Sequence, residues 1–84
     1  MIDWTKCPDV ESVPDRCGGQ WVVKDSRVIV ESCILGNAEA GCTPEEIADM
    51  FEVPGGVDQV RRILRFARLA EAASLLQQAG TIVH

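Results

Sequence analysis

Four arginines near the end of this 84-residue chain are the residues whose spacing most directly implies chemistry. Arg61, Arg62, Arg65 and Arg68 make up half of its eight lysines and arginines. At 100° per residue, Arg61, Arg65 and Arg68 fall within about 60° of one another on a helix. Guanidinium groups in such a row can contact phosphates. We therefore name Gln59, Arg61, Arg62, Arg65 and Arg68 as candidate DNA-binding residues; the alternative is a solvated face paired with acidic helices or with a partner.

The overall charge limits this hypothesis. The chain has a net charge of −5 and a pI of about 4.6, which argues against tight, sequence-independent binding to nucleic acid or to anionic membranes. Residues 31–58 carry seven carboxylates and no lysine or arginine. The sequence therefore predicts a strongly dipolar protein, with acidic helices followed by one basic helical row.

Other chemistry has little support in the sequence. The four cysteines form no C-x-x-C pair, and His84 is the only histidine, so a zinc site is not expected. No signal peptide or apolar run long enough to span a bilayer is recognised, and we expect reduced, mostly packed thiols in a cytoplasmic protein. Hydrolase, metalloprotease and nucleotide-binding motifs are also missing. We expect a protein that is not an enzyme and has no cofactor and no bound metal.

Residues 18–30 are predicted to form a β-hairpin. Its strands, residues 20–24 and 27–30, are rich in valine, and the turn at residues 25–26 is Asp-Ser. An isolated hairpin is only marginally stable, so we expect two copies to pair edge to edge in a dimer. The candidate dimer-interface residues are Trp21, Val22, Val23, Val28 and Val30.

The segment after the hairpin predicts three helices. A short helix begins near residue 31 and ends at Gly41. Thr43, Pro44 and Glu46 then form the signature of a capping box at the start of a second helix. A glycine-containing turn at residues 53–56 leads into a long amphipathic helix that runs to Gln78.

The predicted architecture is a single domain over residues 1–84. It consists of an extended lead-in (1–17), the β-hairpin (18–30), a three-helix bundle (31–78) and a short tail (79–84) that begins where Gly80 is expected to end the last helix. Two short helices followed by a turn and a longer helix are typical of a helix-turn-helix or homeodomain-like bundle. The fold class is therefore mainly α, with an N-terminal β-hairpin used in dimerisation.

The order of these motifs resembles the bacterial and archaeal family known as domain of unknown function 433. That family's pattern has a Gly-Gly pair, a β-run, a Lys/Arg-Gly-Thr-Arg turn, an aliphatic-Pro-Val step, a helix ending in glycine and a Ser/Thr-x-Glu-Glu-Ile helix. The residues that match it are Gly18, Gly19, Arg27, Val28, Val30, Gly41, Thr43, Glu45, Glu46 and Ile47. Asp25-Ser26 stands where Gly-Thr is usual, and Ile29 where proline is usual.

This resemblance implies a homeodomain-like bundle with a dimerising hairpin and an antitoxin-like role. Its partners would be a PIN-like ribonuclease toxin, because family members often lie beside such toxins, and operator DNA. The toxin would meet the acidic helices or the amphipathic end of the last helix, near residues 69–76. The alternative is a small dimerisation or interaction module with neither DNA nor a nuclease as partner, in which the arginines pair with Glu45, Glu46 or Asp49.

Overall fold

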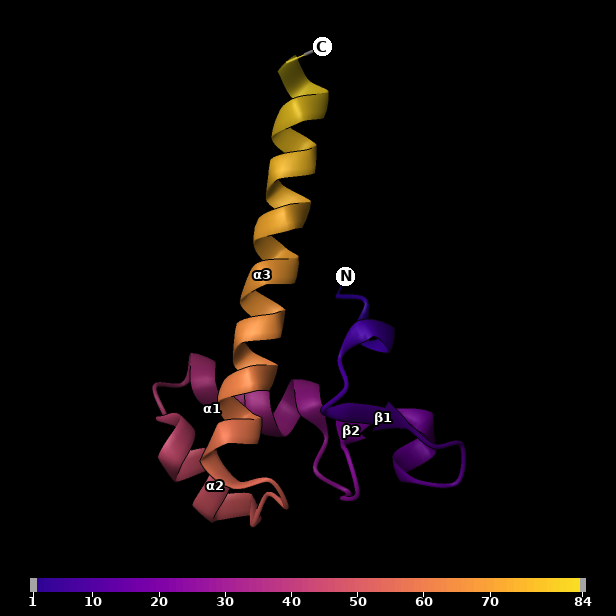
Figure 1. Cartoon of the computed structure of the whole chain (residues 1–84), viewed down its shortest axis with the longest axis vertical. Helices are drawn as coiled ribbons and strands as arrows, with labels where there is room; N and C mark the ends of the chain where they lie inside the picture. The colour runs from indigo at the N-terminus through magenta and orange to yellow at the C-terminus, as the bar shows by residue number, and fades with distance from the viewer. Residues whose placement is uncertain (1, 84) are drawn as a thin grey trace.

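Three α-helices and a small two-stranded antiparallel sheet make up the fold (Figure 1). The computed structural model describes the backbone of residues 2–83 and the side chains of residues 2–73. The regular elements are a 3₁₀ turn at Trp4–Lys6, β1 at Val10–Ser12, a second 3₁₀ turn at Cys17–Gly19, β2 at Trp21–Val23, π-helical turns at Val30–Leu35, α1 at Gly36–Glu39, α2 at Pro44–Phe51 and α3 at Gly56–Val83. The protein is therefore mainly helical, as the sequence predicts.

The sheet differs from the predicted hairpin. β2 lies inside the predicted first strand, but its ladder partner is β1, from the segment expected to be a lead-in, with Val10 opposite Val23. The predicted second strand contributes only one bridge, between Val22 and Ile29, and a hydrogen bond of 2.8 Å from Val23 N to Val28 O. The prediction of paired strands over 18–30 is wrong in this respect, because helical turns already begin at Val30 and end the pairing.

The turn between these two segments is built on an aspartate in a left-handed conformation. Asp25 has φ of +63°, a value that glycine adopts freely and that aspartate tolerates better than most residues. The Ser26 hydroxyl donates to Val23 O at 2.7 Å and accepts from Val28 N at 3.1 Å. The Asp-Ser pair therefore forms a tight turn, as expected.

Two helical segments follow the predicted boundaries closely. The π-helical turns and α1 together cover residues 30–39, and Gly41 ends them with φ of +102°. In α2, the Thr43 hydroxyl accepts from Glu46 N at 3.2 Å and the Glu46 carboxylate accepts from Thr43 N at 3.0 Å. The predicted capping box, with Pro44 in the first helical turn, is confirmed.

The last helix is longer than expected. α3 begins at Gly56 and its backbone stays helical to Val83, so Gly80 does not end it and the predicted tail is mostly helix. Figure 1 shows α3 rising away from the other elements, with only its first half beside them. The radius of gyration is 13.9 Å, against about 12 Å for a compact domain of this length. The upper half of α3 accounts for this elongation.

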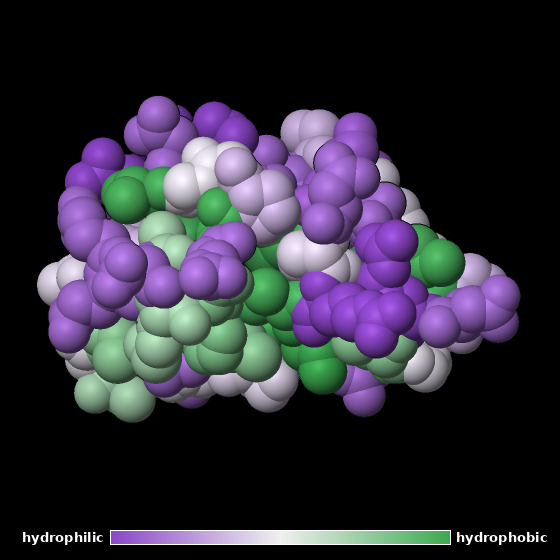
Figure 2. Space-filling model, turned by 90° about the horizontal axis from the view of Figure 1, so that it is seen from below, coloured by the Kyte–Doolittle hydropathy of each residue, from purple (hydrophilic) through white to green (hydrophobic). Residues whose placement is uncertain are grey.

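The core lies where α2, the first half of α3 and the sheet meet. Its buried members are mainly aliphatic: Trp4, Cys7, Val10, Val22, Val23, Val30, Ile34, Ile47, Ala48, Val53, Val60, Ile63 and Ala67. The Trp4 ring also stacks on Phe66, with centroids 5.5 Å apart. The lead-in therefore packs against α3 and belongs to the folded body. Seen from the end where α2 and the start of α3 lie, hydrophobic side chains reach the surface in a strip between hydrophilic ones (Figure 2).

Candidate interaction surface

Two of the four arginines in α3 are engaged within the chain. Arg61 forms an ion pair with Glu45 of α2. Arg62 makes a two-point contact with Asp9, with Nε to Oδ2 at 3.0 Å and Nη2 to Oδ1 at 2.9 Å. The hydrogen bond to Asp9 raises the pKa of Arg62 above its ordinary value. These two guanidinium groups hold α3 to α2 and to the lead-in, so their positive charge is partly neutralised.

The other two arginines are exposed. Among the described side chains, Arg65 and Arg68 form no ion pair and no hydrogen bond. They lie on the outer side of α3, opposite the buried Val60 and Ile63. The basic row predicted from the sequence therefore contains two guanidinium groups that remain available to a partner.

Gln59 is not at the surface, which corrects the prediction that it lies at the exposed start of the last helix. Its side chain is buried, at 6% exposure. Its Oε1 accepts from Gly55 N at 2.8 Å, and its Nε2 donates to Asp9 O at 3.3 Å. A Cβ at position 55 would lie 2.7 Å from Gln59 Oε1, so the glycine makes room for this side chain. Gln59 therefore ties the turn before α3 to the lead-in and is not placed to contact a ligand.

The turn between α2 and α3 has the length of a helix-turn-helix connection. Four residues separate Phe51 from Gly56, and Glu52 at their start has φ of +50°. Val53 N donates to Ala48 O at 3.1 Å, which closes the end of α2. This geometry brings Glu45 of α2 into an ion pair with Arg61, in the second turn of α3.

The outer face of α2 carries acidic side chains around one exposed methionine. Glu45, Glu46 and Asp49 are exposed, and Met50 is 52% exposed. The pKa of the Glu46 carboxyl is held below its ordinary value, first by the hydrogen bond from Thr43 N. The pKa of Glu45 is also lowered, first by a backbone N–H at its own position and then by Arg61. Both groups are therefore charged at neutral pH.

The predicted dimer residues divide into two groups. Val22, Val23 and Val30 are fully buried within the single chain. Trp21 and Val28 are half-buried and packed against the core. β2 has β1 on one side and the bridge to Ile29 on the other, so it is not a free edge. Only Trp21 and Val28 keep surface that a second copy could contact.

A shallow apolar hollow lies where the lead-in meets the middle of α3. Pro8 and Cys7 border it on one side, and Phe66 and Leu69 on the other, in a space of about 230 Å³. Leu69 is 63% exposed. Arg65 also lines this hollow. The sequence placed Leu69 at an amphipathic helix end but gave no sign of the hollow, because Pro8 is 61 positions away along the chain.

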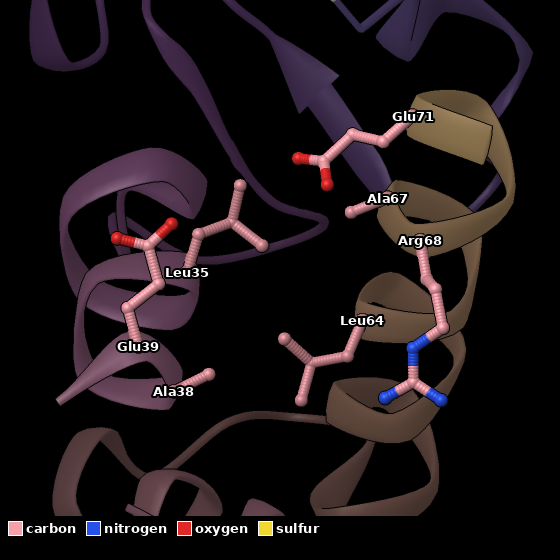
Figure 3. Close-up of a pocket in the computed structure, with 7 residues that line it drawn as sticks. All are labelled: Leu35, Ala38, Glu39, Leu64, Ala67, Arg68 and Glu71. Carbon is pink, nitrogen blue, oxygen red and sulfur yellow. The ribbon is translucent and has the colours of Figure 1, made fainter. Parts of the chain in front are cut away.

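A second groove separates the π-helical turns and α1 from α3 (Figure 3). Its apolar lining comes from Leu35 and Ala38 on one side and from Leu64 and Ala67 on the other. Glu39, Arg68 and Glu71 border it, and its volume is about 260 Å³. Because its charged residues have mixed signs, the groove does not favour a ligand of one charge.

The cysteines do not form a metal centre in the described part of the chain. All four are free thiols; Cys7 is buried and the other three are half-buried. Burial raises the pKa of the Cys7 thiol, which makes it a packing residue at neutral pH. The described residues contain no group of three or more histidine, cysteine, aspartate or glutamate side chains arranged to hold a metal ion. Within the described part of the chain, no helix has both the length and the hydrophobicity that crossing a bilayer requires.

A comparison with protein families gave a match over most of the chain. Residues 10–67 match the family described as "Protein of unknown function (DUF433)". The match spans β1 through the first half of α3, which includes the turn at Asp25, the capping box and the arginines at 61, 62 and 65. No curated protein and no solved structure matches the chain.

Proposed function

Because the chain belongs to the DUF433 family, whose description gives no function, we propose one from its surface and from the role that the resemblance implies. The protein is an antitoxin-like binding protein, a homodimer or higher homo-oligomer, that holds a partner of the PIN-like ribonuclease class. Contact with operator DNA through a homeodomain-like helix-turn-helix is a second activity of the same protein.

The observation that carries partner binding is the projection of α3. Among the described side chains of this helix, Ala67 is the last buried one, and beyond it Arg68, Leu69, Ala72 and Ala73 are exposed. The projecting segment is the part of α3 from residue 68 to Val83. A helix this short is only marginally stable in water by itself, so a partner surface that covers it stabilises it. Helices that bind in a groove present their apolar residues in this way. Residues 74–76 of the predicted toxin-binding end lie outside the described side chains.

Co-expression with the neighbouring gene product tests this function. The full chain is tagged, and Ala73→Arg is compared with Ala40→Arg, which makes the same change at an exposed position at the end of α1. We expect the wild type and Ala40→Arg to retain the neighbouring protein on the affinity column and Ala73→Arg to lose it. Equal retention by both variants, or no co-purification with the wild type, would count against the proposal.

DNA binding is supported by a separate observation, the four-residue turn between α2 and α3 together with two arginines of α3 that have no ion-pair partner among the described side chains. With Gln59 buried and Arg61 and Arg62 paired, the contacting set reduces to Arg65 and Arg68 in each copy. Two phosphate contacts per copy give weak binding with a shallow salt dependence, and a dimer doubles their number. The negative charge of α2 repels the DNA phosphates and weakens binding further.

A gel shift on the sequence upstream of the gene tests this second activity. We expect a shift at low salt that the double variant Arg65→Ala/Arg68→Ala abolishes and that the control Arg27→Ala, at an exposed turn residue, preserves. If the double variant shifts the DNA as well as the wild type does, α3 is not the DNA-contacting helix.

A further inference from the structure

Two large hydrophobic side chains stay exposed in the described part of the chain, and they stand in surroundings of opposite charge. Met50 is 52% exposed and Leu69 is 63% exposed. Met50 follows Asp49 on α2, and Leu69 lies one turn beyond Arg65 on α3. A single exposed apolar residue is ordinary on a protein surface, and the opposite charges beside these two give the complementarity that associating surfaces use.

The first surface, here called the acidic patch, consists of Glu45, Glu46, Asp49 and Met50. At 100° per residue these four positions lie within about 140° of one another, on the side of α2 opposite the buried Ile47 and Ala48. Asp49 forms no ion pair and no side-chain hydrogen bond within the described residues, so its charge is available to a partner. The patch therefore offers one flexible apolar side chain next to free negative charge.

The second surface, here called the basic patch, consists of Arg65, Arg68, Leu69 and the hollow beside Pro8. The carboxylate that lines this hollow, that of Asp9, is already held by Arg62 in the two-point contact. The local charge at this hollow is therefore positive. Phe66 and Leu69 supply an apolar wall that an inserted side chain can contact.

We propose that the acidic patch of one copy binds the basic patch of a second copy. Met50 enters the hollow beside Leu69, while Asp49 and Glu46 approach Arg65 and Arg68. A methionine side chain adapts to such shallow apolar sites because it is unbranched and polarisable. This contact combines opposite charges with an apolar contact. DNA would match the arginines with its phosphates but would leave Leu69 exposed.

Because the two patches differ, the contact is isologous when two copies use both patches reciprocally about a two-fold axis, and heterologous when each copy uses its two patches on different neighbours. It closes into a dimer when both patches of each copy are used at once, and otherwise it extends to a larger oligomer. This inference deepens the homo-oligomer part of the proposed function and rests on it. It uses Arg65 and Arg68, which are also the proposed DNA contacts, and Leu69, which lies on the projecting segment of α3, so self-association competes with both of those contacts. It also moves self-association from the β-hairpin to α2 and α3, in keeping with the burial of Val22, Val23 and Val30.

Charge exchange between the patches tests the proposal. The masses of the wild type, Asp49→Arg and Arg65→Glu are measured by sedimentation equilibrium over a range of concentrations at low and high salt. The control is Arg27→Glu, the same substitution at an exposed turn residue outside both patches. Both substituted patch residues are exposed, and circular dichroism verifies that each variant folds.

We expect the wild type and Arg27→Glu to associate more weakly at high salt. Each single patch variant should associate at least about tenfold more weakly, because like charges then face each other. An equimolar mixture of Asp49→Arg and Arg65→Glu should regain wild-type association. A mixture that fails to recover, or an Arg27→Glu defect of equal size, overturns the proposal. A wild type that is monomeric at every concentration but still retains the neighbouring protein also overturns it, and leaves the partner-binding function standing.

Discussion

The guanidinium of Arg62 and the carboxylate of Asp9 face each other in a two-point contact, although the residues are 53 positions apart in the chain. Asp9 also receives Gln59 Nε2 and Lys24 N at its backbone oxygen, at 3.3 and 2.9 Å. One residue of the lead-in thus joins β2 to α3. This junction positions the hollow beside Leu69, a residue that follows Arg62 by about two turns of α3.

Removing the Asp9 carboxylate should loosen this junction. We expect Asp9→Asn to lower the midpoint of thermal unfolding. The asparagine side chain is uncharged, so the two charge-assisted hydrogen bonds between position 9 and Arg62 become weaker neutral-acceptor bonds. Arg62→Gln should lower it more, because it leaves the carboxylate of Asp9, which is much less exposed than Arg62, without its positive partner. Thermal unfolding followed by circular dichroism measures both, with Asp15→Asn in the exposed lead-in as the control. If the control lowers the midpoint as much as Asp9→Asn, the junction does not stabilise the fold.

The buried Gln59 should be a stability residue. Gln59→Ala leaves Gly55 N without its acceptor, so we expect a loss of about 1–3 kcal/mol in the free energy of unfolding. Gln20→Ala, at an exposed position, should change it by less than about 0.5 kcal/mol. Urea denaturation measures the free energy of unfolding of both variants and of the wild type. An unchanged stability of Gln59→Ala would mean that water replaces the side chain without cost.

The left-handed Asp25 allows a test of turn strain. Asp25→Val should destabilise the protein by about 1–2 kcal/mol, because a β-branched residue is disfavoured at positive φ. Asp25→Gly, which restores the residue usual in the family pattern, should stay within about 1 kcal/mol of the wild type, since relief of strain and added unfolded-state entropy oppose each other. Equal effects of the two substitutions in urea denaturation would contradict the turn conformation.

Stability should fall in acid. The pKa of Glu11 lies below its ordinary value of 4.5, first because Asp25 N donates to it and then because of Arg16, and that of Glu46 lies below 4.5 because of Thr43 N. Groups with lowered pKa values in the folded state contribute stability that is fully present above pH 4.5 and is lost as the pH falls through the folded values.

The measurement is urea denaturation between pH 7 and pH 3. We expect Glu46→Gln to lose less stability over this range than the wild type, because the substituted side chain does not titrate. Glu39→Gln, on the exposed side of α1, is the matched control and should follow the wild type. If the free energy of unfolding of Glu46→Gln falls with pH as steeply as that of the wild type, the capping carboxylate does not contribute to the acid sensitivity.

Local signals in the sequence predicted the features that depend on neighbouring residues. Thr43, Pro44 and Glu46 determine where α2 begins, because the capping box needs only residues three positions apart. Gly41 ends the first helical segment for a similar local reason. The turn at Asp25 could also be predicted, since turn chemistry depends on one or two residues.

The features that the sequence missed depend on contacts between distant segments. The strand partner of β2 comes from Val10–Ser12, and nothing in that segment's own pattern distinguishes a strand from an extended lead-in. Gln59 has the polarity of a surface residue and is buried because Gly55 and Asp9 supply its hydrogen-bond partners. Gly80 is compatible with helix, since a single glycine there costs only about 1 kcal/mol.

Amide hydrogen exchange over α3, with and without the co-expressed neighbouring protein, tests the central claim most directly. The account predicts fast exchange for the projecting half after Ala67 in the protein alone and marked slowing there when the partner is bound, with little change in α2. Slowing confined to α1 and α2, or no difference along α3, would contradict the claim that the projecting helix holds the partner.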